Sequence, residues 1–148
     1  MTTTVATAPA TTKIVWISRH SPSERQLNAL TSHFPNHQLI IDARSFDSAD
    51  TLIARYRAIG GDEMVVVAPL AVIRQLCRRG LHPLYAQMTQ VPCDRPDAEI
   101  TIGNGNRRRC YRFDGFARIR ALDFRLEALP NAPTTTITTA NALDNQVL

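Results

Sequence analysis

The chain has 148 residues, a formal net charge of +4 and 44% hydrophobic residues, which suggests one globular domain. No apolar run approaches the roughly 18 residues of a membrane span, and the start lacks the pattern of a signal peptide. The three cysteines, Cys77, Cys93 and Cys110, are odd in number and form no C-x-x-C pair. This pattern predicts no disulfide framework and favours a reducing cytoplasm.

Composition separates the two ends of the chain from its middle. Residues 1–12 are almost all Thr, Ala and Val, and residues 131–148 are again rich in Thr, Asn and Ala. Neither end can bury enough apolar surface to offset its ordering entropy, so we expect flexible tails at 1–12 and 131–148. Residues 13–130 are expected to form a single domain.

Strands and helices are expected to alternate over the first two thirds of this domain. Apolar runs typical of buried strands lie at residues 13–17, 38–41, 64–67 and 84–88. Apolar residues recur at helical spacing between these runs, and in the third helix we expect the inward residues to be Leu70, Val72, Ile73, Leu76 and Cys77. Alternation of this kind predicts a parallel sheet joined by right-handed crossovers, most simply in the order 2-1-3-4.

Signals for helix ends accompany the first two helices. Ser21, Pro22 and Glu24 match a capping box, with Ser21 as the N-cap, Pro22 at the first helical position and Glu24 reaching back to the Ser21 N–H. The second helix is expected to start at Asp47 or Ser48 and to stop at the glycine pair 60–61.

The pattern changes after Pro92. Residues 99–102 and 109–113 flank a Gly-Asn-Gly-Asn turn, which is typical of a β-hairpin. Residues 116–129 fit either a strand or a helix, and their alternation favours a strand. The expected fold is thus a Rossmann-like α/β open sheet of about four parallel strands, with an appended C-terminal antiparallel β element.

The turn after the first strand is the main candidate for a binding site. In the order 2-1-3-4 the switch point lies between the first and third strands, which places residues 18–21 beside the 68–70 turn. The third helix has Pro69 at its start and no capping side chain, so its first N–H groups are free for water or a phosphate. The expected ligand-binding residues are Ser18, Arg19, His20, Pro69 and Leu70, with Arg74 one turn further on.

Each side chain of the first turn suits a phosphate. Arg19 can make a bidentate contact, and Ser18 can donate a hydrogen bond. His20 can bind an anion as imidazolium or move a proton near neutral pH, so His20 and Arg19 are the candidate catalytic residues. A well-capped helix with solvated neighbours explains the same residues without a ligand.

An arginine cluster is the second candidate site. Sixteen of the seventeen basic residues are Arg, and residues 104–130 hold seven Arg against three acids. The cluster comprises Arg107, Arg108, Arg109, Arg112, Arg118 and Arg120. Interleaved with Tyr111 and Phe113, it can follow a nucleic-acid backbone, or it can be the solvated face of a strand whose aromatics face the core. A GC-rich genome also explains the arginine bias.

Metal and cofactor sites are not expected. His33 and His37 are four residues apart, but residues 35–36 interrupt the helix between them. No G-x-G-x-x-G or G-x-x-x-x-G-K motif is present in the sequence.

The first strand, residues 18–22 (Ser-Arg-His-Ser-Pro) and Gln26 together resemble the start of small CRISPR-associated Rossmann-like proteins. The resemblance implies a homodimer that holds a cyclic oligoadenylate second messenger between its subunits in antiviral signalling. It further implies sequestration of the ligand or its cleavage as a metal-independent ring nuclease. Ser18, Arg19 and His20 would contact the ligand, with Arg19 stabilising charge and His20 acting as acid or base.

Two alternatives stay open. In the first, the protein is a nucleic-acid-binding accessory protein that uses the 107–120 face. In the second, it is an interaction module whose antiparallel segment pairs with the sheet edge of a partner.

Overall fold

The computed structural model describes residues 10–131, so the expected tails lie almost entirely outside the described residues. Its six-stranded sheet has the order β2-β1-β3-β4-β6-β5. The strands are β1 (Thr12–Ile17), β2 (His37–Asp42), β3 (Glu63–Val66), β4 (Leu84–Val91), β5 (Ile100–Ile102) and β6 (Arg109–Arg118). The expected order 2-1-3-4 is confirmed, and Thr12, assigned to the flexible tail, is instead the first residue of β1.

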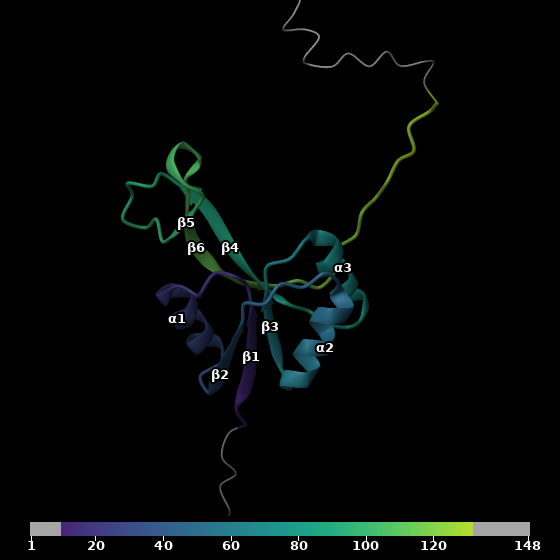
Figure 1. The fold of residues 1–148 in the computed structure, drawn as a ribbon, viewed down its shortest axis with the longest axis horizontal. Coiled ribbons are helices and arrows are strands. Elements are labelled where there is room, and N and C mark those ends of the chain that lie inside the picture. The colour runs from purple at the N-terminus through teal and green to yellow at the C-terminus, as the bar shows by residue number, and fades with distance from the viewer. Residues whose placement is uncertain (1–9, 132–148) are drawn as a thin grey trace, which may run out of the picture.

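The antiparallel part is more than an appendage to the parallel sheet. β4 pairs with β6 along its whole length, and β5 pairs with the start of β6 at the outer edge. β3 and β4 share only one register pair, Val65 with Leu84. The β4–β6–β5 ribbon therefore projects from the parallel half and curls away from it (Figure 1).

Helices cover both faces of the parallel half (Figure 1). One face carries α1 (Glu24–His33), and the other carries α2 (Ala49–Ile59) and α3 (Leu70–Arg78). Side chains of β1 alternate between the two layers: Ile14 and Trp16 pack with Leu30 of α1, and Val15 and Ile17 pack on the α2 and α3 side. Burial on both faces explains why β1 reads as one continuous apolar run.

The start of α1 lies two residues later than the sequence suggests. Ser23, not Ser21, is the N-cap, and its Oγ accepts a hydrogen bond from the Gln26 N–H at 3.2 Å. Gln26 Oε1 accepts from the Ser23 N–H at 2.9 Å, which completes the capping box without Glu24. Gln26 is only 4% exposed, so the box also satisfies the amide of a side chain that is buried.

The ends of α2 follow their sequence signals. Ser48 is the N-cap, and Gly60 adopts the left-handed conformation with φ of 75°. Gly61 lies against the ring of Tyr56 and Val15, where a Cβ has no room. Burial raises the pKa of Tyr56 to about 12, and the nearby carboxylates of Glu63 and Asp62 are the second cause, so this phenol stays neutral.

The strand expected over residues 116–129 ends at Arg118. Beyond it the chain has neither helix nor strand up to residue 131, because β4 begins at Leu84, opposite Arg118, and offers nothing further to pair with. The Ile119 N–H donates to the Pro83 carbonyl at 2.9 Å, and Phe124 lies beside Arg74. The segment thus runs from the end of β6 towards α3.

Cys93 and Cys110 form a disulfide, so the expectation of no disulfide framework is wrong. The register of β4 and β6 places Cys110 opposite Val91, two residues before Cys93, and this closeness is invisible in the spacing of the cysteines. Cys77 is the free cysteine, and burial raises the pKa of its thiol. Because disulfides persist in oxidising compartments, the bond does not support the expected reducing cytoplasm.

No helix within residues 10–131 is long and apolar enough to cross a membrane.

Candidate functional site

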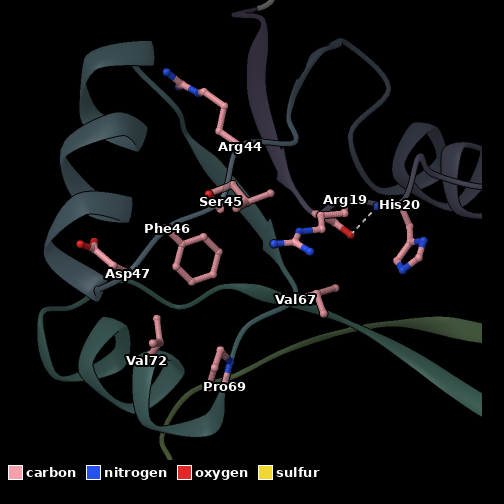
Figure 2. A pocket seen from close by; sticks show the side chains of 11 residues that line it. Arg19, His20, Arg44, Ser45, Phe46, Asp47, Val67, Pro69 and Val72 are labelled. Atoms are coloured by element: carbon pink, nitrogen blue, oxygen red, sulfur yellow. Dashed lines mark hydrogen bonds between the residues drawn. The ribbon is translucent and has the colours of Figure 1, made fainter.

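A cleft of about 310 Å³ opens at the carboxyl ends of β1, β2 and β3. Three loops line it: residues 18–20 after β1, residues 44–47 after β2, and Val67 with Pro69 after β3. Carboxyl ends of parallel strands meet at one edge of a sheet, and ligands of open α/β sheets bind there. The structure thus brings Ser18, Arg19, His20 and Pro69 together (Figure 2).

Two hydrogen bonds hold the turn after β1, one from a side chain of β1 and one within the turn. The buried Trp16 indole N–H donates to the His20 carbonyl oxygen at 2.8 Å. The His20 N–H donates to the Ser18 Oγ at 3.1 Å, shown as the dashed line in Figure 2. These two bonds fix the backbone that presents Arg19, while the Ser18 hydroxyl keeps its own proton to donate.

Arg19 is the available cation of the cleft. It is exposed and has no ion-pair or hydrogen-bond partner among residues 10–131. Figure 2 shows its guanidinium extending between Val67 and the ring of Phe46. The Asp47 carboxylate points away from it and accepts from the Thr51 hydroxyl at 2.8 Å. That hydrogen bond is the main reason that the pKa of Asp47 is lowered.

His20 lies on the other side of Arg19. Its imidazole is exposed and points away from Phe46 in Figure 2. A ligand that packs on Phe46 must therefore extend past Arg19 to reach His20.

The loop after β2 completes the cleft, and sequence reasoning missed it. Arg44 lines the cleft, but its Nε and Nη2 each donate to one oxygen of Asp42 at 2.9 Å. In Figure 2 the Arg44 guanidinium points out of the cleft. Phe46 supplies an aromatic wall. The strand-end rule that selected residues 18–20 also applies to the end of β2, so this loop could have been found.

Asp42 is expected to make a pH-dependent contribution to stability. The Arg44 side chain, above all, holds the pKa of the Asp42 carboxyl below its ordinary value of 3.8. Such a carboxyl stabilises the fold above its unfolded pKa, and this contribution is lost as the pH falls through the folded pKa. Asp42→Asn should therefore lower the free energy of unfolding. The loss should have its full size at about pH 6 and should become progressively smaller below about pH 4.

Urea unfolding at a series of pH values measures this difference. Asp123→Asn is the control, because Asp123 is exposed and takes part in no ion pair within residues 10–131. A loss for Asp42→Asn that is the same at every pH would contradict the role of the charged carboxyl.

Leu70 and Arg74 do not take part in the cleft. Leu70, expected to face inward, is 58% exposed. Arg74, expected to reinforce a phosphate at the start of α3, places its guanidinium 5.4 Å from the centre of the Phe124 ring. The segment after β6 thus draws Arg74 away from the helix start. Pro69 is the N-cap of α3 and makes no side-chain cap, as the sequence predicts.

The six clustered arginines do not form one face. Arg107, Arg108 and Arg109 are exposed at the β5–β6 turn. Arg112 is held by Asp114 at 2.8 Å and by Asp97 at 3.4 Å. Arg118 makes a bidentate ion pair with Glu63, at 2.8 and 2.9 Å, at the far end of the strand, and the exposed Arg120 follows it. The expected 107–120 face therefore reduces to its first three residues.

The aromatic residues of β6 differ in burial. Phe113 is buried and Tyr111 only half-buried, so the expectation that both face the core holds fully for Phe113 alone.

No group of three or more metal-ligating side chains occurs within residues 10–131. His37, considered with His33, has its Nδ1 2.7 Å from the Phe34 carbonyl oxygen.

Comparison of the chain with protein-family models, curated proteins and solved structures finds no match. The cleft and its side chains are therefore the basis for assigning a function.

Proposed function

We propose that the cleft binds a nucleotide-type ligand through its phosphate. The observation that supports this most directly is Arg19, whose guanidinium has no partner among the described residues and is held by an anchored turn at the switch point of the sheet. The Ser18 hydroxyl adds a hydrogen-bond donor beside Arg19. Phe46 and Val72 offer an apolar wall on which a base can pack.

A cyclic oligoadenylate is the specific ligand that we propose, on the resemblance of the first strand and turn. Its adenines suit the apolar wall, and its phosphodiesters suit Arg19. Its ring is larger than a cleft of about 310 Å³ holds, which favours a ligand shared between two subunits of a homodimer. The homodimer is part of the proposal, and light scattering with and without ligand tests it.

Cleavage of the ring would need no metal. The ribose 2′-hydroxyl attacks the adjacent phosphorus, the bond to the 5′-oxygen breaks, and a 2′,3′-cyclic phosphate and a 5′-hydroxyl result. Arg19 would stabilise the charge that develops on the phosphoryl oxygens, and His20 would move the proton. A protein that only sequesters the ligand uses the same side chains for affinity.

Calorimetric titration with cyclic tetraadenylate and cyclic hexaadenylate tests the binding. AMP and inorganic phosphate are the smaller probes, and chromatography of the incubated ring reveals linear products. Binding without product would assign sequestration, whereas product from the native protein and none from His20→Gln would assign cleavage. If none of the four probes binds, the cleft is not a nucleotide site.

Arg19→Ala is expected to weaken ligand binding by about 10- to 100-fold, the effect of losing a charged hydrogen-bonding partner. Arg57→Ala is the matched control, because it removes the same charge from an exposed position in the last turn of α2, away from the cleft. Calorimetry of the two variants measures the difference. Equal losses in both would mean that net charge, and not the cleft, determines affinity.

A further inference from the structure

A second positively charged surface lies on the β5–β6 turn, and the cleft does not account for it. We call it the arginine knuckle, made of Arg107, Arg108 and Arg109. All three side chains are exposed, and none has an acidic partner in the part of the chain that the structure describes. The acidic Asp97 is already taken by Arg95, at 2.9 Å, and by Arg112. Local acids therefore neutralise other arginines and leave the knuckle charged.

The knuckle borders a groove that is lined by polar side chains. Gln90, near the end of β4, and Asn106, in the turn, line it together with the three arginines. Protein–protein interfaces usually have an apolar centre, and this groove has none. Guanidinium groups with neighbouring amides instead match the oxygens of phosphate groups.

The backbone of the knuckle is well braced. Gly105–Arg107 forms a turn of 3-10 helix, in which the Arg107 N–H donates to the Asn104 carbonyl at 3.1 Å. Gly103 has φ of 85°, and a Cβ there would collide with the Arg107 carbonyl. The Cys93–Cys110 disulfide ties the strand immediately after Arg109. A loop that is already ordered loses little conformational entropy on binding, so this cost offsets little of the attraction between its charges and a ligand.

We propose that the arginine knuckle binds the phosphodiester backbone of a nucleic acid, at a site separate from the cleft. The ribbon of β4, β6 and β5 carries the knuckle away from the helices of the parallel half (Figure 1). Three guanidiniums contact about three phosphates. Backbone contacts alone predict affinity with little dependence on sequence.

Binding of a labelled 20-nucleotide single strand, measured by fluorescence anisotropy over a salt series, tests this site. Three phosphate contacts to a single strand predict a slope of about −2 in log affinity against log salt, or about a 20-fold loss between 50 and 200 mM. RNA, DNA and duplex probes of equal length show which form of the backbone binds best.

The triple variant Arg107→Gln, Arg108→Gln, Arg109→Gln should lose most of the affinity and nearly all of the salt slope. A matched triple variant removes the same charge from exposed arginines elsewhere, namely Arg57, Arg78 and Arg125, each replaced by Gln. Urea unfolding of both confirms that they fold.

The site is overturned if the two triple variants lose affinity equally, or if polyglutamate of similar length binds as well as the oligonucleotides do. Arg19→Ala should leave this binding unchanged, which separates the knuckle from the cleft. A loss of oligonucleotide affinity in Arg19→Ala would place the nucleic acid in the cleft instead.

Discussion

Replacing Trp16 by alanine is expected to lower the free energy of unfolding by about 3–5 kcal/mol, as for other large buried aromatic side chains. Trp16 is 3% exposed, and its ring meets the Phe116 ring edge-on with centroids 6.3 Å apart. The substitution opens a cavity in the layer that also contains Leu30 and Val65. Urea unfolding of the purified variant measures the loss.

Trp16→Phe separates the packing of this residue from its hydrogen bond. Phenylalanine keeps an aromatic ring but cannot donate to the His20 carbonyl, a bond worth about 1 kcal/mol. The turn that carries Arg19 then loses its anchor, so we expect about a 5-fold weaker ligand affinity although Trp16 does not line the cleft.

Phe116→Leu is the matched control for the anchor. It loosens the same layer from the neighbouring ribbon and leaves the bond from Trp16 to the His20 carbonyl in place. If it weakens ligand binding as much as Trp16→Phe does, packing and not the hydrogen bond holds the turn.

Reduction of the Cys93–Cys110 disulfide is expected to lower the free energy of unfolding by about 3 kcal/mol, a value typical of closed loops of about this length. The bond joins residues 17 apart in sequence and links the loop after β4 to the second residue of β6. Its main effect is to restrict the unfolded chain. Urea unfolding with and without a dithiol reductant measures the change.

Two variants make this test specific. Cys77→Ser should keep the response to reductant, because Cys77 carries the free thiol. The double variant Cys93→Ser, Cys110→Ser should already have the lower stability and should not respond. Three free thiols in the native protein under non-reducing conditions, counted by alkylation and mass, would contradict the disulfide.

The parallel half of the fold could be predicted because its signals are local. Apolar runs, a left-handed glycine after α2 and the alternation of strands with helices are sufficient for the order 2-1-3-4. The start of α1 could not, because Ser21 with Glu24 and Ser23 with Gln26 both fit a capping box. Burial of Gln26 in the folded protein decides between them.

Part of the cleft could also be predicted. Ser18, Arg19, His20 and Pro69 follow from the ends of the first and third strands, and the structure places all of them in the cleft. Contacts between distant segments could not be predicted in the same way. The ring that holds Arg74 comes from the segment after β6.

The disulfide likewise depends on the register of β4 and β6, which the sequence alone does not specify. Spacing rules say nothing about such encounters, since they arise only when the strands have paired.

The single register pair between β3 and β4 has a mechanical consequence. It leaves the parallel half and the β4–β6–β5 ribbon joined along a short seam, which the Arg118–Glu63 ion pair and the contact between Trp16 and Phe116 reinforce. The cleft belongs to the parallel half and the arginine knuckle to the ribbon. The start of α1, which follows the cleft turn, provides a second link, because Ser23 and Arg25 contact Glu99, just before β5, at 3.3 and 2.6 Å. Any mutual influence between the two sites has to pass through these contacts between the two halves.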